Sequence, residues 1–118
     1  MSDDRYLYHY TVESDWEAAT AAGEYRVSGR GLTLDGEGFI HFCYAGQRPG
    51  VWQRFWADID LAAEPVVLLT VDPDDLDPQL LKDENTSGGT ELFPHLYGPL
   101  PVEAVTAVHA VDAAGNPV

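Results

Sequence analysis

The sequence predicts one α+β domain with five or six short strands, two helices and long loops. Its 118 residues suit a single core, and 45% of them are hydrophobic, which is enough to fill that core. Runs rich in tyrosine and β-branched residues, typical of strands, outnumber the stretches with helical spacing. No internal repeat divides the chain. We therefore expect an ordered core over about residues 5–112, with tails at 1–4 and 113–118.

The first third of the chain predicts a strand, a short helix and an irregular segment. Residues 5–12 (RYLYHYTV) have the composition of a strand. Ser14 and Glu17 have the spacing of a capping box, which predicts a short helix that Gly23 ends. Residues 25–38 are rich in glycine, so we expect them to be irregular.

The middle of the chain predicts a strand, a helix and a second, fully buried strand. Residues 39–44 (FIHFCY) form the first strand and residues 65–72 (PVVLLTVD) the second, whose uninterrupted apolar run predicts burial on both faces. Pro49 suits the first turn of a helix between them. Large apolar residues then recur at helical spacing, namely Val51, Trp52, Phe55, Trp56 and Ile59.

The last third predicts two further strands separated by loops. Residues 79–84 form the first of these strands, and residues 85–93 form a flexible loop. Residues 94–101 contain three prolines and a glycine, so we expect a rigid loop rather than regular structure. Residues 104–112 alternate in the manner of a closing strand, and the chain then frays.

Composition and charge exclude several classes of function. The net charge is −14, and such a surface repels a phosphate backbone, so we expect no non-specific nucleic-acid binding. No run of about 18 apolar residues exists, so we expect no membrane span. The N-terminus is acidic and lacks the apolar stretch of a secretory signal. The single cysteine, Cys43, fits a reducing compartment, which predicts a cytoplasmic protein.

Three of the four histidines lie in apolar, aromatic surroundings, and their neighbours suggest a shared pocket. In each of two predicted strands a histidine is followed two residues later by a hydroxyl or a thiol, which places both groups on the same face. The third histidine lies in the proline-rich segment, followed two residues later by a tyrosine. The candidate pocket residues are His9, Thr11, His41, Cys43, His95 and Tyr97. Each histidine also fits a purely structural position in the core, where neighbouring protein groups form hydrogen bonds with its ring nitrogens.

Other side chains are weaker candidates. Arg48, near the start of the predicted second helix, suits a phosphate, although a surface role explains it better. Glu84 ends a predicted strand and suits a ribose hydroxyl or an exposed ion pair. The three histidines allow a zinc site, but no paired ligand motif supports one. Cys43 also suits a nucleophile. His109, in the closing strand, is expected to be structural or exposed.

The order of motifs along the chain resembles the bacterial family numbered 952 among the domains of unknown function. The pair GFIH and FPHLYGPL at this separation is specific, and the resemblance extends from about Tyr6 to Val108. After the histidine of GFIH the family usually has cysteine and then serine, whereas this chain has Phe42 and Cys43. Any role of that serine would pass here to the thiol. The motifs that carry the resemblance are, in chain order, YHYT, Trp16, GEY, EGFIHFC, Gln47, RFW, VVLLTVD and FPHLYGPL.

This resemblance implies a small split antiparallel β-sheet core like that of ADP-ribosyltransferases, with NAD as the implied ligand. YHYT resembles the first-strand motif of the diphtheria-toxin and poly-ADP-ribose polymerase group, so His9 and Thr11 would contact the ribose and the nicotinamide amide. His41 would act as acid or base, while His95 and Tyr97 would orient the ligand. The group's catalytic glutamate has no matching motif here. Its candidates are Glu84, Glu91 and Glu103.

The sequence thus leaves four hypotheses open. The first is an enzyme acting on a nucleotide or NAD-like small molecule, of the ADP-ribosyltransferase type. The second is a non-enzymatic module that binds a small metabolite in the same cleft. The third is a metal-dependent hydrolase, and the fourth is a purely structural or interaction protein. The sequence predicts neither the ligand nor the oligomeric state.

Overall fold

The structure is a computed structural model that describes residues 5–118, so the tail expected at 1–4 lies outside the described residues. The α+β class and the antiparallel pairing of the sheets agree with the prediction. In chain order the elements are β1 (Leu7–Val12), α1 (Glu13–Ala22), β2 (Glu24–Tyr25), β3 (Val27–Gly29), β4 (Leu32–Thr33), α2 (Leu34–Glu37), β5 (Ile40–His41), α3 (Arg48–Phe55), β6 (Val66–Val71), β7 (Leu81–Glu84), β8 (Phe93–Leu96), β9 (Leu100–Pro101) and β10 (Val105–Ala110).

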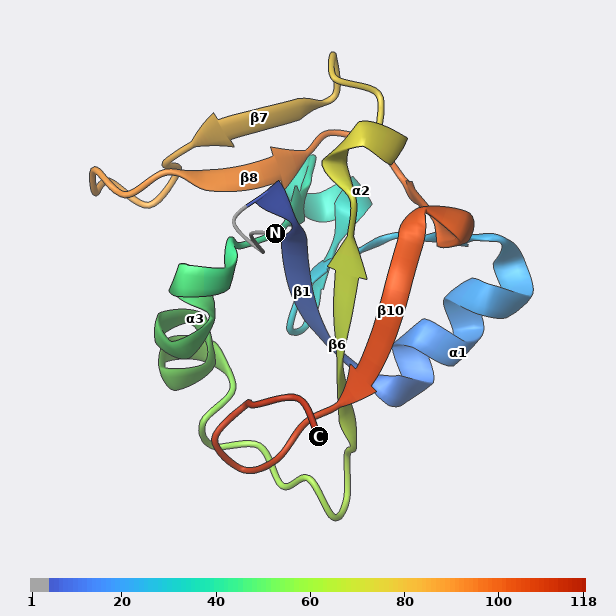
Figure 1. Ribbon diagram of the computed structural model, residues 1–118, viewed down its shortest axis with the longest axis vertical. Helices are drawn as coiled ribbons and strands as arrows, with labels where there is room; N and C mark the ends of the chain where they lie inside the picture. The colour runs from blue at the N-terminus through green and yellow to red at the C-terminus, as the bar shows by residue number, and fades with distance from the viewer. Residues whose placement is uncertain (1–4) are drawn as a thin grey trace.

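A three-stranded antiparallel sheet in the order β1-β6-β10 forms the centre of the molecule (Figure 1). The prediction that β6 is buried on both faces is confirmed, because five of its six residues are buried. Val67, Leu69 and Val71 pack into one core cluster with Ala19 of α1. Val66 and Leu68 of β6 pack on the opposite face, in a second cluster with Val51 and Trp52 of α3. The two helices therefore cover opposite faces of this sheet.

A second antiparallel sheet in the order β5-β8-β7 lies across one end of the first (Figure 1). The two sheets are joined by a β-bridge between Tyr8 and Cys43, where each residue's N–H donates to the other's carbonyl, at 2.8 and 2.9 Å. Beyond this bridge the outer edge of β1 forms no ladder with the described residues. Along that edge the two sheets therefore meet at the Tyr8–Cys43 bridge and separate beyond it.

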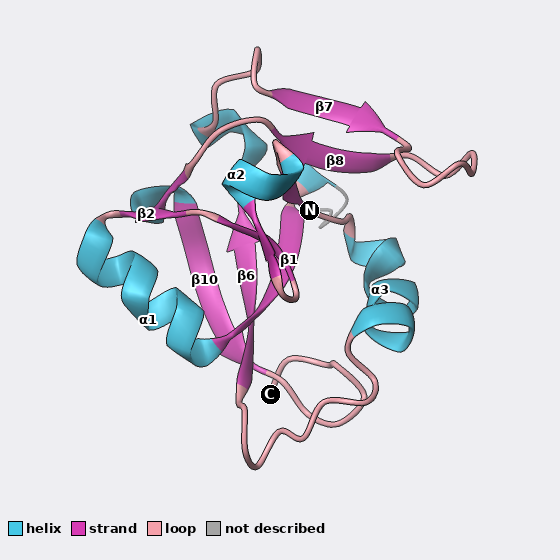
Figure 2. Ribbon diagram, turned by 180° about the vertical axis from the view of Figure 1, so that it is seen from behind, coloured by secondary structure: helices cyan, strands magenta, loops and turns pink. Residues whose placement is uncertain are grey.

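The glycine-rich and proline-rich segments are more regular than the sequence predicts. Residues 25–38 contain the β3–β4 hairpin and α2, which Figure 2 shows from behind. The prediction that residues 94–101 form a rigid loop is wrong for 94–96, which belong to β8, the middle strand of its sheet, and for 100–101, which form β9. Residues 97–99 do form a loop. Proline has no backbone N–H to donate to a neighbouring strand. Pro94 is tolerated in β8 because its pairing uses the carbonyl, which accepts a hydrogen bond from Phe42 N–H at 2.9 Å.

Both predicted helices are present with shifted ends. Helix α1 starts at Glu13, and its N-cap, Val12, makes no side-chain capping bond, so the predicted Ser14–Glu17 capping box is absent. The end of β1 fixes this start, because Glu13 N–H donates to the carbonyl of Pro65, just before β6. Gly23 ends the helix in the left-handed conformation, as predicted. Among residues 5–118, no helix has the length and apolar character needed to cross a membrane.

The C-terminal segment 113–118 packs against the domain instead of fraying as expected. The Tyr10 hydroxyl donates to the carbonyl of Gly115 at 2.8 Å, and the Trp52 indole N–H donates to that of Ala113 at 3.1 Å. Val111 and Pro117 form a β-bridge. These bonds anchor the segment on the α3 side of the sheet, where the buried tyrosine and tryptophan each need an acceptor.

We predict that Gly115→Ala destabilises the protein by about 2–4 kcal/mol. Gly115 has φ +83°, and a Cβ there would lie 2.5 Å from the Trp52 ring, so the substitution combines backbone strain with a clash. Urea unfolding followed by tryptophan fluorescence measures the loss. Gly50→Ala is the matched control, because Gly50 lies inside α3 with open space around it; it should stabilise the helix by up to about 1 kcal/mol. Equal stability of the two variants would contradict the packing of the C-terminal segment.

Candidate functional site

A cavity of about 690 Å³ lies along the outer edge of β1, between the β3–β4 hairpin and α3. Its buried lining residues, which we call the floor, include His9, Phe42, Cys43 and His95. Its exposed lining residues, which we call the rim, include Arg30, Leu32, Arg54 and Phe55. His41 also lines the cavity, with 40% of its side chain exposed. The structure therefore brings the three predicted histidines to one cavity.

His41 and His95 form a cross-strand pair. They are directly opposite each other in the β5–β8 ladder, and their ring centroids are 5.1 Å apart in an edge-to-face arrangement. Phe39 stacks on the His95 ring at 4.1 Å and also contacts the edge of His41. Opposite residues in antiparallel strands point to the same face, so the short β5–β8 register alone places the two rings together.

The carboxylate of Glu84 fixes the orientation of His95. Glu84 accepts a hydrogen bond from His95 Nδ1 at 3.0 Å and a second, short one from the Tyr97 hydroxyl. Both hydrogen bonds lower the pKa of Glu84, and the one from Tyr97 has the larger effect. Because a carboxylate only accepts, Nδ1 of His95 carries a proton, which leaves Nε2 as the lone-pair nitrogen of the neutral ring. His95 is itself buried, so its carboxylate partner is what makes this position tolerable.

His41 is the accessible member of the pair. Its Nε2 lies 4.0 Å from Oε1 of Glu37, which precedes it by four residues at the end of α2. Partial burial lowers the pKa of His41, and the neighbouring His95 lowers it further, while Glu37 raises it. His41 is therefore mainly neutral at pH 7 and able to accept a proton from a bound molecule.

His9 is held by the protein on both sides of its ring. Its Nδ1 bonds the backbone carbonyl of His41 and must therefore donate, while its Nε2 accepts from the Tyr25 hydroxyl at 2.6 Å. Burial lowers the pKa of His9 to about 4. The expected contact of His9 with a ribose hydroxyl stays a prediction, and in this geometry neither nitrogen is available for it.

The remaining predicted residues differ in their distance from the cavity. Cys43 lines the floor but is 2% exposed, and burial raises its pKa to about 12, so its thiol is not activated as a nucleophile. Thr11 is buried and lines a separate, smaller cavity of about 270 Å³. Arg48 lies over the Tyr8 ring at 4.7 Å and is not part of the lining. Glu84 and Tyr97 support His95 without lining the cavity.

Sequence reasoning missed several residues that shape the site. Tyr25 holds His9, Phe39 supports both other histidines, and Glu37 faces His41. The sequence already places Phe39 on the same strand face as His41, and Glu37 is only four residues from His41. Tyr25 carried no signal, because its partner His9 is 16 residues away in sequence. Among residues 5–118, no group of three His, Cys, Asp or Glu side chains is arranged to hold a metal ion.

We predict that His9 makes the protein less stable as the pH falls from about 6.5 to about 4. The unfolded chain binds a proton at His9 below its ordinary pKa, whereas the folded protein resists protonation until about pH 4. The stability lost is on the order of 3 kcal/mol. Urea unfolding at pH 7 and pH 5 measures the part of this loss that falls between those two values, about 2 kcal/mol. His9→Gln should reduce this pH dependence, and His109→Gln, at an exposed site in β10, should retain it. An unchanged pH dependence in His9→Gln would contradict the assignment.

We predict that neutral His95 carries its proton on Nδ1. Ring ¹⁵N chemical shifts above pH 8 distinguish the two tautomers. Glu84→Gln should allow the other tautomer, because the amide that replaces the carboxylate is able to donate to Nδ1. The exposed His109 provides the reference ring. Detection of Nε2–H as the main form of His95 in the unmodified protein would be incompatible with the Glu84 bond.

Comparison with known proteins places the chain beside an experimentally determined structure of the same fold. The crystal structure of protein CC0527 from Caulobacter crescentus is 31% identical, with a TM-score of 0.76 over 96% of this chain and 93% of that one. The solution NMR structure of CC0527 aligns with a TM-score of 0.69. No match was found among curated proteins. The family model described as "Protein of unknown function (DUF952)" matches residues 10–108, so the chain belongs to that family.

Proposed function

We propose that the cavity binds a nucleotide or an NAD-like small molecule and that His41 and His95 serve as its acid–base pair. The observation that carries this proposal is the meeting of histidines from β1, β5 and β8 at one cavity of about 690 Å³. That volume lies within the range of small-molecule sites, which combine apolar walls with a few convergent polar groups.

The walls of the cavity suit a flat ring. Tyr8, Trp56 and Phe93 are all among its lining residues, and aromatic side chains stack on nucleobases without requiring a particular base. The divergence of two sheets from the Tyr8–Cys43 bridge is in keeping with the split core of ADP-ribosyltransferases. This likeness concerns architecture, and the reaction must be argued from the site.

The chemistry of the floor favours proton transfer. His95 is oriented by Glu84, as the base of a catalytic pair commonly is, and His41 is exposed enough to exchange protons with solvent. A group bound above the pair would meet two imidazoles in different environments, one held by a carboxylate and one partly solvated. Such a difference in environment allows one ring to act as acid while the other acts as base.

A non-enzymatic binding module is the second candidate. Two observations favour it: His9 has no free nitrogen, and Glu84 is engaged with His95 and Tyr97 rather than lining the cavity. Both functions predict the same binding site, and only turnover distinguishes them. A metal-dependent hydrolase has less support, since the described residues offer no ligand set.

The test is an NMR titration of the four histidine rings with NAD and with ADP-ribose. We expect His41 and His95 to shift together, with His9 following through its bond to the His41 carbonyl, while His109 stays unchanged. His41→Ala should weaken binding by about tenfold or more. It should change the free energy of unfolding by less than about 1 kcal/mol, because the ring is partly exposed.

His109→Ala is the matched control and should bind like the unmodified protein. The proposal fails if millimolar NAD and ADP-ribose leave all four rings unmoved. It also fails if His41→Ala binds normally. Incubation of NAD with the protein, followed by chromatography, then separates the two candidates: loss of NAD that requires His41 supports an enzyme.

A further inference from the structure

We infer that Arg54 forms an anion-binding subsite at the rim of the cavity and that this subsite receives a phosphate group of the ligand. The inference rests on the proposed function for the identity of the whole ligand. It adds the orientation of that ligand, with the phosphate toward α3 and the remainder toward the histidines.

The first support is the pairing of positive charges. The chain has six Lys and Arg against twenty Asp and Glu, so a cation without a carboxylate partner is unexpected. Arg5, Arg26 and Arg30 each have a carboxylate oxygen within 4.0 Å of a guanidinium nitrogen. Within the described part of the chain, Arg48, Arg54 and Lys82 form no such ion pair. Arg54 alone of these three lines the cavity.

The second support is the way in which Arg54 is held. Its guanidinium lies 5.6 Å from the ring centroid of Phe55 and 5.7 Å from that of Phe93. Its Nε donates a long hydrogen bond, 3.4 Å, to the carbonyl of Gly50, and its terminal nitrogens make no hydrogen bond to residues 5–118. Stacking on aromatic rings orients a guanidinium while leaving its edge free for the paired hydrogen bonds that a phosphate accepts.

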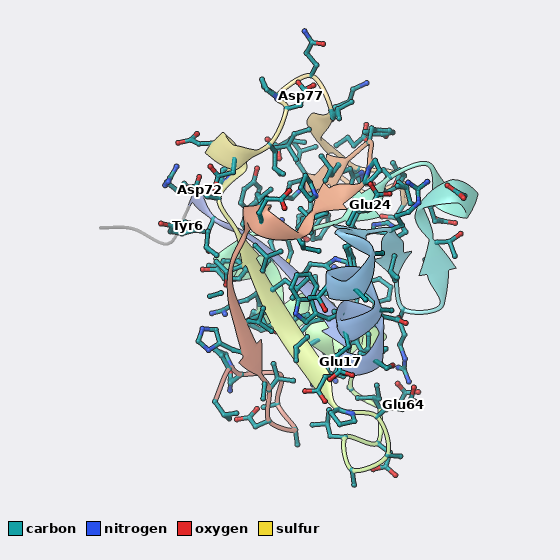
Figure 3. All side chains as sticks on the ribbon, turned by 90° about the vertical axis from the view of Figure 1, so that its right-hand side faces the viewer. Tyr6, Glu17, Glu24, Glu64, Asp72 and Asp77 are labelled. Atoms are coloured by element: carbon teal, nitrogen blue, oxygen red, sulfur yellow. The ribbon has the colours of Figure 1, made fainter. Side chains whose placement is uncertain are left out.

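The third support is the local balance of charge. Arg30, the other cation of the lining, is occupied by Asp58 at 2.6 Å and by the Phe55 carbonyl at 2.9 Å. Elsewhere the surface is acidic, and Figure 3 shows the labelled Glu17 and Glu64 on the outside of the molecule. An anionic ligand is therefore repelled by the protein in general, and its phosphate needs a specific cation at the point of entry.

The fourth support is spacing. Arg54 stacks on Phe93, and Phe93 precedes His95 by two residues on the same face of β8. Two residues along a strand span about 7 Å. Arg54 and the histidines are therefore linked through one strand face of the same cavity, and a ligand held by its phosphate at Arg54 would extend toward His95. The ligand class that fits is a sugar phosphate or a nucleotide.

The experiment follows the arginine Nε–H signals by NMR during titration with inorganic pyrophosphate and, separately, with succinate. We expect a saturable shift of Arg54 with pyrophosphate, weakened by added salt, while Arg26 stays unchanged. Arg54→Gln should abolish the accompanying shifts of backbone amides around the cavity. Arg54→Lys should retain part of them, because it keeps the charge but loses the planar fork.

Arg26→Gln is the matched control, because it removes the same charge from an exposed site outside the cavity. The inference is overturned if pyrophosphate leaves Arg54 unmoved, or if Arg26→Gln weakens pyrophosphate binding as much as Arg54→Gln does. An equal response of Arg54 to succinate would overturn the assignment to phosphate and point to carboxylates.

A comparison of AMP with adenosine links the subsite to the proposed function. We expect AMP to bind about tenfold more tightly than adenosine, and Arg54→Gln to remove that difference. If adenosine moves the histidine rings while pyrophosphate leaves Arg54 unmoved, the subsite is wrong and the nucleotide proposal stands. If pyrophosphate moves Arg54 while no nucleotide moves the histidines, the subsite stands and the nucleotide proposal fails.

Discussion

The geometry of the cavity depends on one buried imidazole. His9, in the central sheet, donates to the backbone carbonyl of His41 in the second sheet and accepts from Tyr25. Each partner is a buried polar group that would be costly to leave unpaired, so the three elements hold one another in place. Because the bond goes to the backbone of His41, it positions this strand and leaves the His41 ring free. In this geometry His9 supports the strand that carries His41, and its expected contact with a ligand stays a prediction.

Support and reactivity are divided among similar residues according to their partners. His9, His41 and His95 are all imidazoles at one cavity, yet their partners differ. His9 bonds a carbonyl and a phenol, His41 faces a partly solvated acid, and His95 donates to a partly buried carboxylate. Burial has a comparable effect on Cys43, whose thiol stays protonated although it lies at the floor. Residue type therefore indicates which chemistry is available, and the environment determines which group performs it.

The sequence predicts those elements whose evidence is local. The uninterrupted apolar run of β6 and the helical spacing of α3 both carry their own signal. The two-residue strands do not, because β2 exists only through its pairing with β9, about 75 residues away in sequence. Pro94 led to the wrong prediction of a loop for the same reason. Whether a strand tolerates proline depends on which of its backbone groups the neighbouring strands use. The histidines could be named in advance, whereas the Glu84–His95 bond depends on a hairpin register that composition does not encode.

The long-range character of these contacts also bears on how the chain folds. His9 bonds partners 16 and 32 residues away, Tyr10 bonds a carbonyl 105 residues away, and β6 joins strands from both ends of the chain. Chains dominated by distant pairings fold slowly, since the entropy of closing large loops is lost before the contacts form. The floor residues named above extend from His9 to His95, so no short fragment of the chain contains all of them. The capacity to hold a ligand should therefore arise late in folding, and a partly synthesised or partly unfolded chain should lack it altogether.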